Sequence, residues 1–307
     1  MSAANSGGLK STDASMPLPL FKIGGDLLVN RLGFGAMRLT GQPGNWGPYP
    51  DWEHGVRVLR DAVEMGVNFI DTADAYGPGD SEELIADALH PYAETIVIAT
   101  KGGTVKTGPG AFHANGSPEY LRAACDASLR RLKRDCIDLY QLHRVDPSVP
   151  LAESVATLVE LQKAGKIKHI GLSNITLTQL QDAEQVTRIA SVQNRYNLLL
   201  RDDDPVIDYC LSREIAYLPW SPLGTSPFER YSPIASGTDG TLHAIASRHH
   251  ARAGQVALAW LMYRSPNIVA IPGTTSLAHL KENVTASQVR LSAEDLETLN
   301  TLFTQKP

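Results

Sequence analysis

The sequence contains little cysteine. Its three cysteines, Cys125, Cys136 and Cys210, occur in 307 residues, and no two of them form a CxxC pair. A sparse and odd number of cysteines suits a reducing compartment, so we expect a cytoplasmic protein. Each cysteine is interpreted as a small packed side chain rather than a nucleophile.

Long apolar runs and targeting signals are also missing. No stretch approaches the ~20 apolar residues that a membrane-spanning helix needs, so we expect no membrane segment. Residues 1–17 are rich in Ser, Gly and Ala, and they contain neither an arginine nor an apolar run of signal-peptide length. We expect them to form a disordered tail, followed by a single domain over residues 18–307.

Positive charge is not concentrated anywhere in the chain. The formal net charge is -5 and the pI is about 6.0. No basic stripe alternates with aromatic residues, so we expect no nucleic-acid partner. The composition, with 43% hydrophobic and 20% charged residues, is that of a globular protein long enough to bury a core. Nothing in the sequence indicates an oligomeric state.

The sequence does contain an alternation of short β-branched runs with amphipathic segments. The predicted strands are residues 33–39, 68–72, 96–101, 137–143, 167–172, 191–195, 215–220 and 268–272. The predicted helices are residues 53–65, 81–89, 117–132, 151–163, 176–187, 203–213, 241–262 (as two helices) and 277–287. Strand–helix alternation produces parallel strands with helical crossovers, and eight such units predict an α/β fold of the (β/α)8 TIM barrel type.

An open, doubly wound sheet is the competing architecture. Its dinucleotide-binding turn requires three glycines ahead of a helix. Segment 33–38 (GFGAMR) lacks the third glycine, and no helix follows it promptly. Before the barrel, the sequence GGD at 24–26 separates two apolar runs and predicts a β-hairpin that caps the N-terminal end of the barrel. Ser81, ahead of two glutamates, is predicted to cap a helix.

Polar residues follow several of the predicted strands where each strand ends. Asp71 ends the second strand, Lys101 the third and His143 the fourth, and Tyr76 lies in the loop after Asp71. Any one of these could be a salt-bridged strand end or a core histidine. Because a barrel brings the carboxyl ends of all its strands to one face, where active sites lie, we expect the four side chains to meet there.

The four residues can form a tuned general acid. Tyrosine has a reference pKa near ~10, which a neighbouring lysine ammonium lowers because it favours the phenolate. An aspartate beside Lys101 holds the ammonium charged and in place, and a histidine can orient a carbonyl oxygen. Such a set suits protonation of a carbonyl oxygen while a hydride arrives at carbon. The hydride requires a cofactor, since no side chain supplies one.

The sequence resembles the aldo-keto reductases in eight motifs, which follow one another from about residue 20 to the C-terminus. They are GFGAM, NFIDTADAYG, ATKGG, LYQLH, GKIKHIGLSN, VQNRYN, PWSPLG and IPGTTSLAHLKEN. The resemblance is strongest to a bacterial branch that includes pyridoxal reductases. It implies that Asp71, Tyr76, Lys101 and His143 form a catalytic tetrad in which Tyr76 is the acid. It also implies reduction of aldehydes or ketones to alcohols, with pyridoxal as one candidate substrate.

The resemblance further implies an NADP(H) cofactor, with NAD(H) as the alternative. Residues 173, 174 and 193 would hold the nicotinamide carboxamide, Trp220 would stack on the nicotinamide ring, 221–225 would follow the pyrophosphate, and 273–283 would grip the adenosine end. The implied contacts are Gly35, Ala36, Met37, Asp71, Ser173, Asn174, Gln193, Trp220, Ser221, Pro222, Leu223, Gly224, Thr225, Ile271, Gly273, Thr274, Thr275, His279, Glu282 and Asn283.

The sequence departs from the animal members of the family at the phosphate and substrate sites. Gly273 and His279 stand where those members have a lysine and an arginine for the 2′-phosphate, with Lys281 and Arg230 as other candidate cations. Arg144 replaces an aromatic pocket residue. The expected pocket comprises Met37, Trp46, Tyr76, His143 and Arg144, with His113 as a further candidate.

Two other functions remain open at this point. Some relatives of this family are attached to channels as cofactor-binding, redox-sensing subunits with little turnover. A Schiff-base aldolase would use Lys101, but its lysine must be neutral, whereas Asp71 would keep Lys101 charged. The histidines at 243, 249 and 250 are interpreted as a surface cluster rather than a metal site, because no further ligand is spaced to join them.

Overall fold

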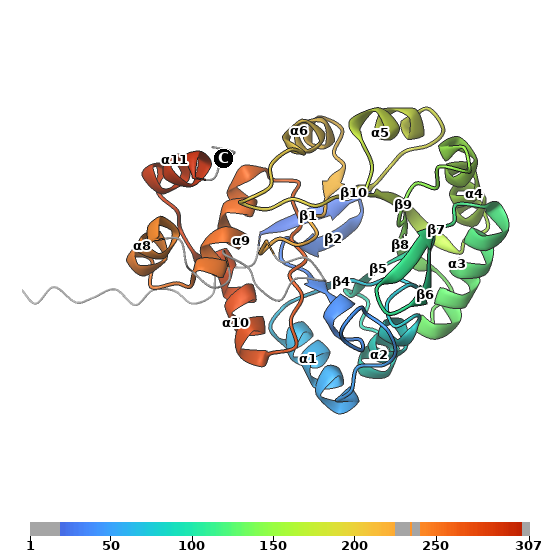
Figure 1. Ribbon diagram of the computed structural model, residues 1–307, viewed down its shortest axis with the longest axis horizontal. Helices are drawn as coiled ribbons and strands as arrows, with labels where there is room; N and C mark the ends of the chain where they lie inside the picture. The colour runs from blue at the N-terminus through green and yellow to red at the C-terminus, as the bar shows by residue number, and fades with distance from the viewer. Residues whose placement is uncertain (1–18, 225–233, 235–239, 303–307) are drawn as a thin grey trace, which may run out of the picture.

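The computed structural model describes residues 19–224, 234 and 240–302. Its centre is a curled parallel sheet of seven strands in the order β11-β10-β9-β8-β5-β4-β3 (Figure 1). These strands are β3 (Phe34–Gly35), β4 (Phe69–Asp71), β5 (Val97–Gly102), β8 (Ile137–Leu142), β9 (Ile167–Ser173), β10 (Ser191–Gln193) and β11 (Ala216–Tyr217).

The eighth strand position closes the barrel through single bridges. Ile268 pairs with Tyr217 of β11, and Ala270 pairs with Leu32, which directly precedes β3. The predicted strand 268–272 is therefore reduced to bridges, but it occupies the expected place between the first and last strands of the sheet. The predicted strand 33–39 is also shorter, because β3 ends at Gly35 and a 3-10 helix, η1 (Ala36–Arg38), follows it.

Helices surround the sheet and cover its outer face (Figure 1). Their bounds are α1 (Trp52–Glu64), α2 (Asp80–Leu89), α3 (Pro118–Leu132), α4 (Leu151–Lys163), α5 (Leu177–Glu184), α6 (Asp204–Ser212), α8 (Gly240–Arg248), α9 (Ala253–Arg264), α10 (Leu277–Thr285), η2 (Ala286–Gln288) and α11 (Ala293–Thr301). The (β/α)8 prediction is confirmed in architecture. Helix α11 was not predicted, although Ser292 and Asp295 form a capping box at its start.

Inner and outer faces alternate along the strands as a period of two requires. In β5, Val97 and Ala99 pack inside the barrel, whereas Ile98 belongs to the cluster between sheet and helices. Lys101 continues the inner series. In β4 the inner series is Phe69 then Asp71, so both charged side chains belong to the inner face at the carboxyl ends of their strands.

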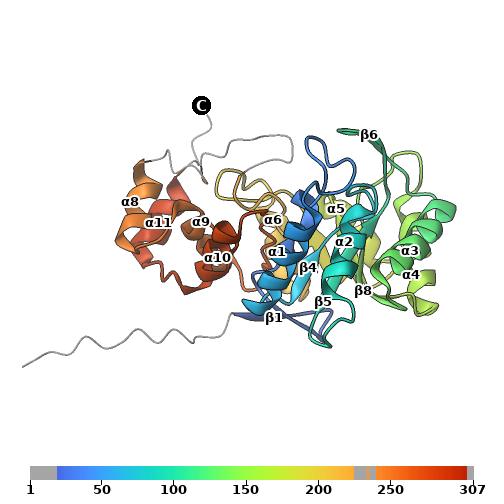
Figure 2. The same ribbon diagram turned by 90° about the horizontal axis from the view of Figure 1, so that it is seen from below.

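The predicted N-terminal hairpin is confirmed. Strand β1 (Leu20–Ile23) pairs antiparallel with β2 (Leu27–Asn30). Ile23 and Val29 are fully buried and pack with inner barrel residues such as Phe69 and Leu139. The hairpin therefore closes the amino-terminal end of the barrel, and Figure 2 shows β1 at the end opposite β6.

A second hairpin, which was not predicted, stands at the carboxyl end of the barrel. Strand β6 (Thr104–Gly108) pairs antiparallel with β7 (Ala111–Ala114) directly after β5 (Figure 2). Another prediction was wrong in detail: α2 begins at Asp80 with Gly79 as its N-cap. Ser81 instead lies inside α2 and hydrogen-bonds Thr72 at 2.9 Å.

Within the described ranges, no helix is both long and apolar enough to cross a membrane. Helices α8 and α11 lie beside each other, outside the ring formed by α1–α6 (Figures 1 and 2). Asp295 of α11 joins the two helices. Its carboxylate lies 2.7 Å from the His249 ring nitrogen and forms an ion pair with Arg248. His249 thus has a structural contact at this helix pair.

Candidate active site

A cavity of about 340 Å³ opens at the carboxyl end of the barrel strands. Residues from the ends of β3, β4, β9 and β10 and from the loops after them meet in its wall. The lining comprises Gly35, Met37, Arg38, Asn45, Asp71, Ala75, Tyr76, Thr104, Lys106, Phe112, His143, Arg144, Ser173, Asn174, Gln193, Arg195, Trp220, Ser221, Pro222, Leu223, Ile271, Pro272 and Gly273. Most of the predicted site residues are therefore brought together.

Lys101 and Asp71 form a buried ion pair beneath the cavity. The Lys101 Nζ lies 2.7 Å from Asp71 Oδ1, and the side chains are 0% and 3% exposed. The ammonium also donates to the Thr72 carbonyl at 2.7 Å. Burial alone would lower the pKa of Lys101, but the charges of Asp71 and Tyr76 outweigh it and hold that pKa above its usual value. Lys101 is therefore charged, which argues against a neutral nucleophilic amine.

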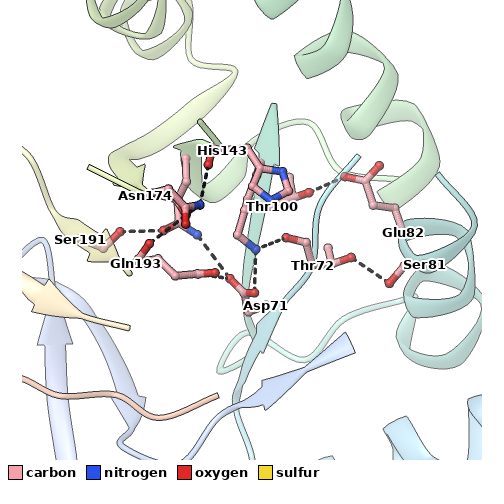
Figure 3. A network of polar contacts seen from close by, with 12 residues as sticks. Asp71, Thr72, Ser81, Glu82, Thr100, His143, Asn174, Ser191 and Gln193 are labelled. Atoms are coloured by element: carbon pink, nitrogen blue, oxygen red, sulfur yellow. Dashed lines mark hydrogen bonds and ion pairs between the residues drawn. The ribbon is translucent and has the colours of Figure 1, made fainter. Parts of the chain in front are cut away.

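The second oxygen of Asp71 is also held. Gln193 donates to Asp71 Oδ2 at 2.8 Å (Figure 3), and Gln141 donates to the same atom at 3.3 Å. Gln141 was not predicted as a site residue. It lies two positions before His143 on β8, and a glutamine in the inner series of an apolar strand was the signal available in the sequence. These amides fix the carboxylate so that its other oxygen faces Lys101.

Tyr76 lies between this ion pair and His143. The Lys101 ammonium is 5.2 Å from the centroid of the Tyr76 ring. The His143 ring packs edge-on against the Tyr76 ring, with the two centroids 5.9 Å apart and an interplanar angle of 83°. Burial raises the pKa of Tyr76 above its usual value; Lys101 opposes this rise, and Asp71 adds to it. Lys101 lowers the pKa of Tyr76 as expected, but burial raises that pKa by more, so the phenol is protonated at neutral pH.

His143 is a neutral imidazole. Burial lowers its pKa well below the usual value, and the charges of Lys101, Arg144 and Lys106 lower it further. Its Nδ1 is buried and has no hydrogen-bond partner among the described residues. A neutral ring beside a phenol can donate a hydrogen bond from its N–H to a carbonyl oxygen without carrying charge.

Asn174 ties together one wall of the cavity. Its side chain donates to the His143 carbonyl at 3.0 Å and to Ser173 Oγ at 2.9 Å, and it accepts from the Trp220 indole at 3.1 Å. Ser173 in turn donates to the Gln193 carbonyl at 2.8 Å. The three predicted carboxamide residues thus lie together beside Trp220, and Asn174 orients that indole.

Close backbone contact fixes another part of the cavity wall. A Cβ at Gly35 would lie 2.6 Å from the Ile271 carbonyl oxygen, and one at Gly273 would lie 2.5 Å from the Gly35 oxygen. Both glycines are therefore required for the approach of these segments. Nearby, Ser221 has a φ of 58° and a buried Oγ without a partner among the described residues. Pro222 and Leu223 line the cavity, and Gly224 has a φ of 75°.

Apart from Gly273, the predicted adenosine contacts do not line the cavity. Helix α10 starts after Ser276, whose side chain accepts from the backbone of exposed His279 at 3.4 Å. The Thr275 carbonyl contacts His54 at 2.6 Å. Glu282 lies 3.7 Å from exposed Arg252. The remaining predicted contacts are Ala36, the buried first residue of η1, and Thr274 and Asn283, which are also buried.

Thr225, a predicted cofactor contact, and Arg230, an alternative candidate cation for the 2′-phosphate, fall in residues 225–233, which the structure does not describe.

The substrate side differs from the prediction in two residues. Met37 and Arg144 line the cavity, but Trp46 does not; it is 40% exposed and bridges Gly77. His113 lies exposed on β7, outside the lining. The β6–β7 hairpin instead contributes Thr104, Lys106 and Phe112, none of which was predicted.

The fold and the cavity define a barrel enzyme with a buried Lys–Asp pair below a tyrosine, and sequence comparison gives its family. Residues 31–303 match the model of the Aldo/keto reductase family, to which the chain belongs. A pyridoxine 4-dehydrogenase of Escherichia coli is 43% identical over 278 residues, covering 89% of this chain and 94% of that protein. An uncharacterized oxidoreductase of Schizosaccharomyces pombe is 43% identical over 270 residues, covering 88% and 85%.

A solved structure has the same fold. An aldo-keto reductase from Klebsiella pneumoniae in complex with NADPH superimposes with a TM-score of 0.78 at 25% identity, covering 94% of this chain and 96% of that one. The resemblance inferred from the eight motifs is confirmed.

Proposed function

We propose that this protein reduces aldehydes or ketones to alcohols with NADPH, and that Tyr76 gives the proton to the carbonyl oxygen. The observation that carries the proposal is the buried Lys101–Asp71 pair at 2.7 Å, placed below a protonated tyrosine in the wall of the cavity. A bound nicotinamide cofactor supplies the hydride that this chemistry needs. The side chains supply the proton and the position of the carbonyl group.

The four residues have distinct tasks in this proposal. Tyr76 is held in the protonated form by burial and donates its proton as negative charge develops on the carbonyl oxygen. Lys101 stabilises the phenolate that remains, because its ammonium is close and permanently charged. Asp71 positions Lys101, and neutral His143 orients the carbonyl oxygen.

The cavity fits a nicotinamide dinucleotide. Ser221 Oγ is a buried polar atom without a partner in the described ranges, as expected where a polar ligand group binds. Ser173 and Gln193 would hold the carboxamide, the Trp220 ring would stack on the nicotinamide, and the segments at 221–224 and 273–283 would hold the phosphates and the adenosine. The cofactor of the Klebsiella pneumoniae relative is NADPH, which supports NADP(H) here.

The substrate proposal includes pyridoxal. A relative 43% identical to this chain is named a pyridoxine 4-dehydrogenase. The test is NADPH oxidation, followed by absorbance, with pyridoxal and a panel of aldehydes and ketones. Tyr76→Phe is the matched control and should turn over ~10²–10⁴-fold more slowly, because it lacks the proton donor. NADPH binding that occurs without oxidation by any carbonyl compound would instead indicate a redox-sensing subunit.

A further inference from the structure

Positively charged side chains gather in the wall of the cavity. Four cationic side chains line it, those of Arg38, Lys106, Arg144 and Arg195. Among the described lining residues, Asp71 is the only acidic one, and it is already paired with Lys101. A ligand that enters this cavity therefore meets several cationic side chains.

The four cations fall on two sides. Arg195 lies over the Trp220 ring at 5.5 Å, and the Arg38 side chain approaches Gly273, where a Cβ would lie 4.0 Å from its Cγ. Trp220 and Gly273 belong to the proposed cofactor side. Lys106 comes from β6 and Arg144 from the loop after β8, so these two belong to the wall beside Tyr76 and His143.

Arg144 has no anionic partner in the part of the chain that the structure describes. Its guanidinium lies 4.9 Å from the centroid of the Phe112 ring, and no hydrogen bond or ion pair of its side chain occurs there. Arg144 is half-buried, and none of its nitrogens is a buried atom that lacks a partner, so its five donors reach solvent and are open to an acceptor on a ligand. The Phe112 contact places the guanidinium in the wall of the cavity.

Lys106 adds a second charge that remains unneutralised in the described structure. Its ammonium donates to the carbonyl oxygens of Gly44 and Asn45, which are neutral acceptors. A lysine ammonium has three donors, so these contacts hold it in place and leave one. The charges of Lys106 and Arg144 both act on the His143 imidazole, so their field reaches the position proposed for the carbonyl group.

We propose that the preferred substrates are carbonyl compounds that carry an anionic group, a carboxylate or a phosphate, bound by Arg144 together with Lys106 while the carbon frame packs against Phe112. This inference rests on the proposed carbonyl reduction and adds the class of substrate to it. A planar guanidinium binds a carboxylate or a phosphate through two parallel hydrogen bonds, which gives both affinity and orientation.

The test compares three para-substituted benzaldehydes at saturating NADPH: 4-formylbenzoate, 4-formylbenzamide and 4-formylphenyl phosphate. The amide has nearly the shape of the carboxylate but no charge. We expect kcat/KM for at least one anion to exceed that for the amide by ~10–100-fold, the size of a charge-assisted hydrogen bond. The anion with the larger ratio identifies which group the site selects.

The variants assign the preference to residues. Arg144→Gln should bring the anion-to-amide ratio close to one, mainly through KM, and Arg144→Lys should restore part of it. Arg122→Gln, which removes an exposed arginine on α3, is the matched control and should keep the parental ratio. Thermal unfolding and NADPH titration by tryptophan fluorescence check that each variant is folded and binds cofactor.

The failures of the two proposals can be told apart. Two results overturn the substrate inference while carbonyl reduction stands. One is an anion-to-amide ratio of kcat/KM near one in the parent, and the other is an equal loss of kcat/KM for all three aldehydes in Arg144→Gln. A loss of NADPH affinity that accounts for the whole effect also overturns it, because Arg144 would then bind the cofactor. If NADPH reduces none of the three aldehydes, nor any other carbonyl compound, the proposed function itself fails.

Discussion

The Lys101 ammonium lies 5.2 Å from the centroid of the Tyr76 ring, and it reaches this position because Asp71 holds it at 2.7 Å. Asp71 ends β4, Lys101 lies on the neighbouring β5, and Tyr76 lies in the loop after β4. Asp71 therefore acts on the phenol through the position of Lys101 as well as directly. This arrangement predicts that mutations of the two charged residues will not be independent.

A double-mutant cycle tests that coupling. Asp71→Asn and Lys101→Met should each slow NADPH-dependent reduction, because each removes support for the Tyr76 phenolate. The double variant should be about as slow as Lys101→Met alone, since residues that act as one unit give non-additive effects. The measurement is kcat with one aldehyde. Losses that add in log kcat would mean that Asp71 and Lys101 have separate tasks.

The pH profile of reduction should lack a histidine step. Burial and nearby cations hold the pKa of His143 well below its usual value, so the ring stays neutral when the pH falls through ~6.5. Burial raises the pKa of Tyr76, so the donor stays protonated up to the ordinary tyrosine value of ~10. We expect kcat for reduction to be flat from about pH 6 to 9 and to fall only at higher pH.

Alcohol oxidation should show the opposite trend. It needs the phenolate as a base, so its kcat should rise with pH across the same range. Steady-state rates at saturating cofactor in both directions measure this. A fall in the reduction rate centred near pH 8 would show that the phenol ionises far below the range that its burial implies.

Asp74 should make folding stability depend on pH. Burial, reinforced by the charge of Glu82, raises the pKa of Asp74 to about 7. The folded state then keeps a proton that the unfolded chain has released above ~3.9, so this group lowers the free energy of unfolding as pH rises from about 4 to 7. The contribution is constant above that range.

Asp74→Asn isolates this effect. The asparagine oxygen can still accept the 2.9 Å hydrogen bond from Tyr120, but it cannot ionise. Relative to the parent, the variant should gain stability between pH 5 and 8, by roughly 3 kcal/mol at most, on the scale of 1.36 kcal/mol per pKa unit. Urea unfolding at both pH values measures it. A parent-to-variant difference that is the same at both would show that Asp74 does not titrate in this interval.

His279 is the predicted reader of the 2′-phosphate. Its side chain is exposed in the first turn of α10, within the segment proposed to hold the adenosine. We expect His279→Ala to weaken NADPH several-fold more than NADH, which has no such phosphate. Lys281→Ala, on the same helix, and Arg252→Ala, beside Glu282, are the comparison variants. If His279→Ala weakens NADPH and NADH equally, His279 does not bind the 2′-phosphate. The residue whose variant weakens NADPH more than NADH, Lys281 or Arg252, would then be the one that binds it.

The sequence by itself determined the barrel and the positions of its charged strand ends. Short strands alternating with amphipathic helices have one closed parallel solution, and a period of two places Asp71, Lys101 and His143 in the inner series. The cap at Gly24–Gly25 followed from turn chemistry that is local in the chain. Helix α11 could also have been predicted from the sequence, because its capping box is a local signal.

Only the tertiary structure decided the direction in which the pKa of Tyr76 shifts and which residues line the substrate side of the cavity. Lys101 favours the Tyr76 phenolate as expected, but the burial that outweighs it is produced by segments far apart in the chain. Trp46 and His113 lie outside the cavity, whereas Lys106 and Phe112 reach it on a hairpin whose strands are short and largely exposed. The spacing of apolar residues in a sequence indicates which face of a strand or helix is buried. The strands of a half-exposed hairpin have no clear apolar spacing, so the sequence does not show which site the hairpin covers.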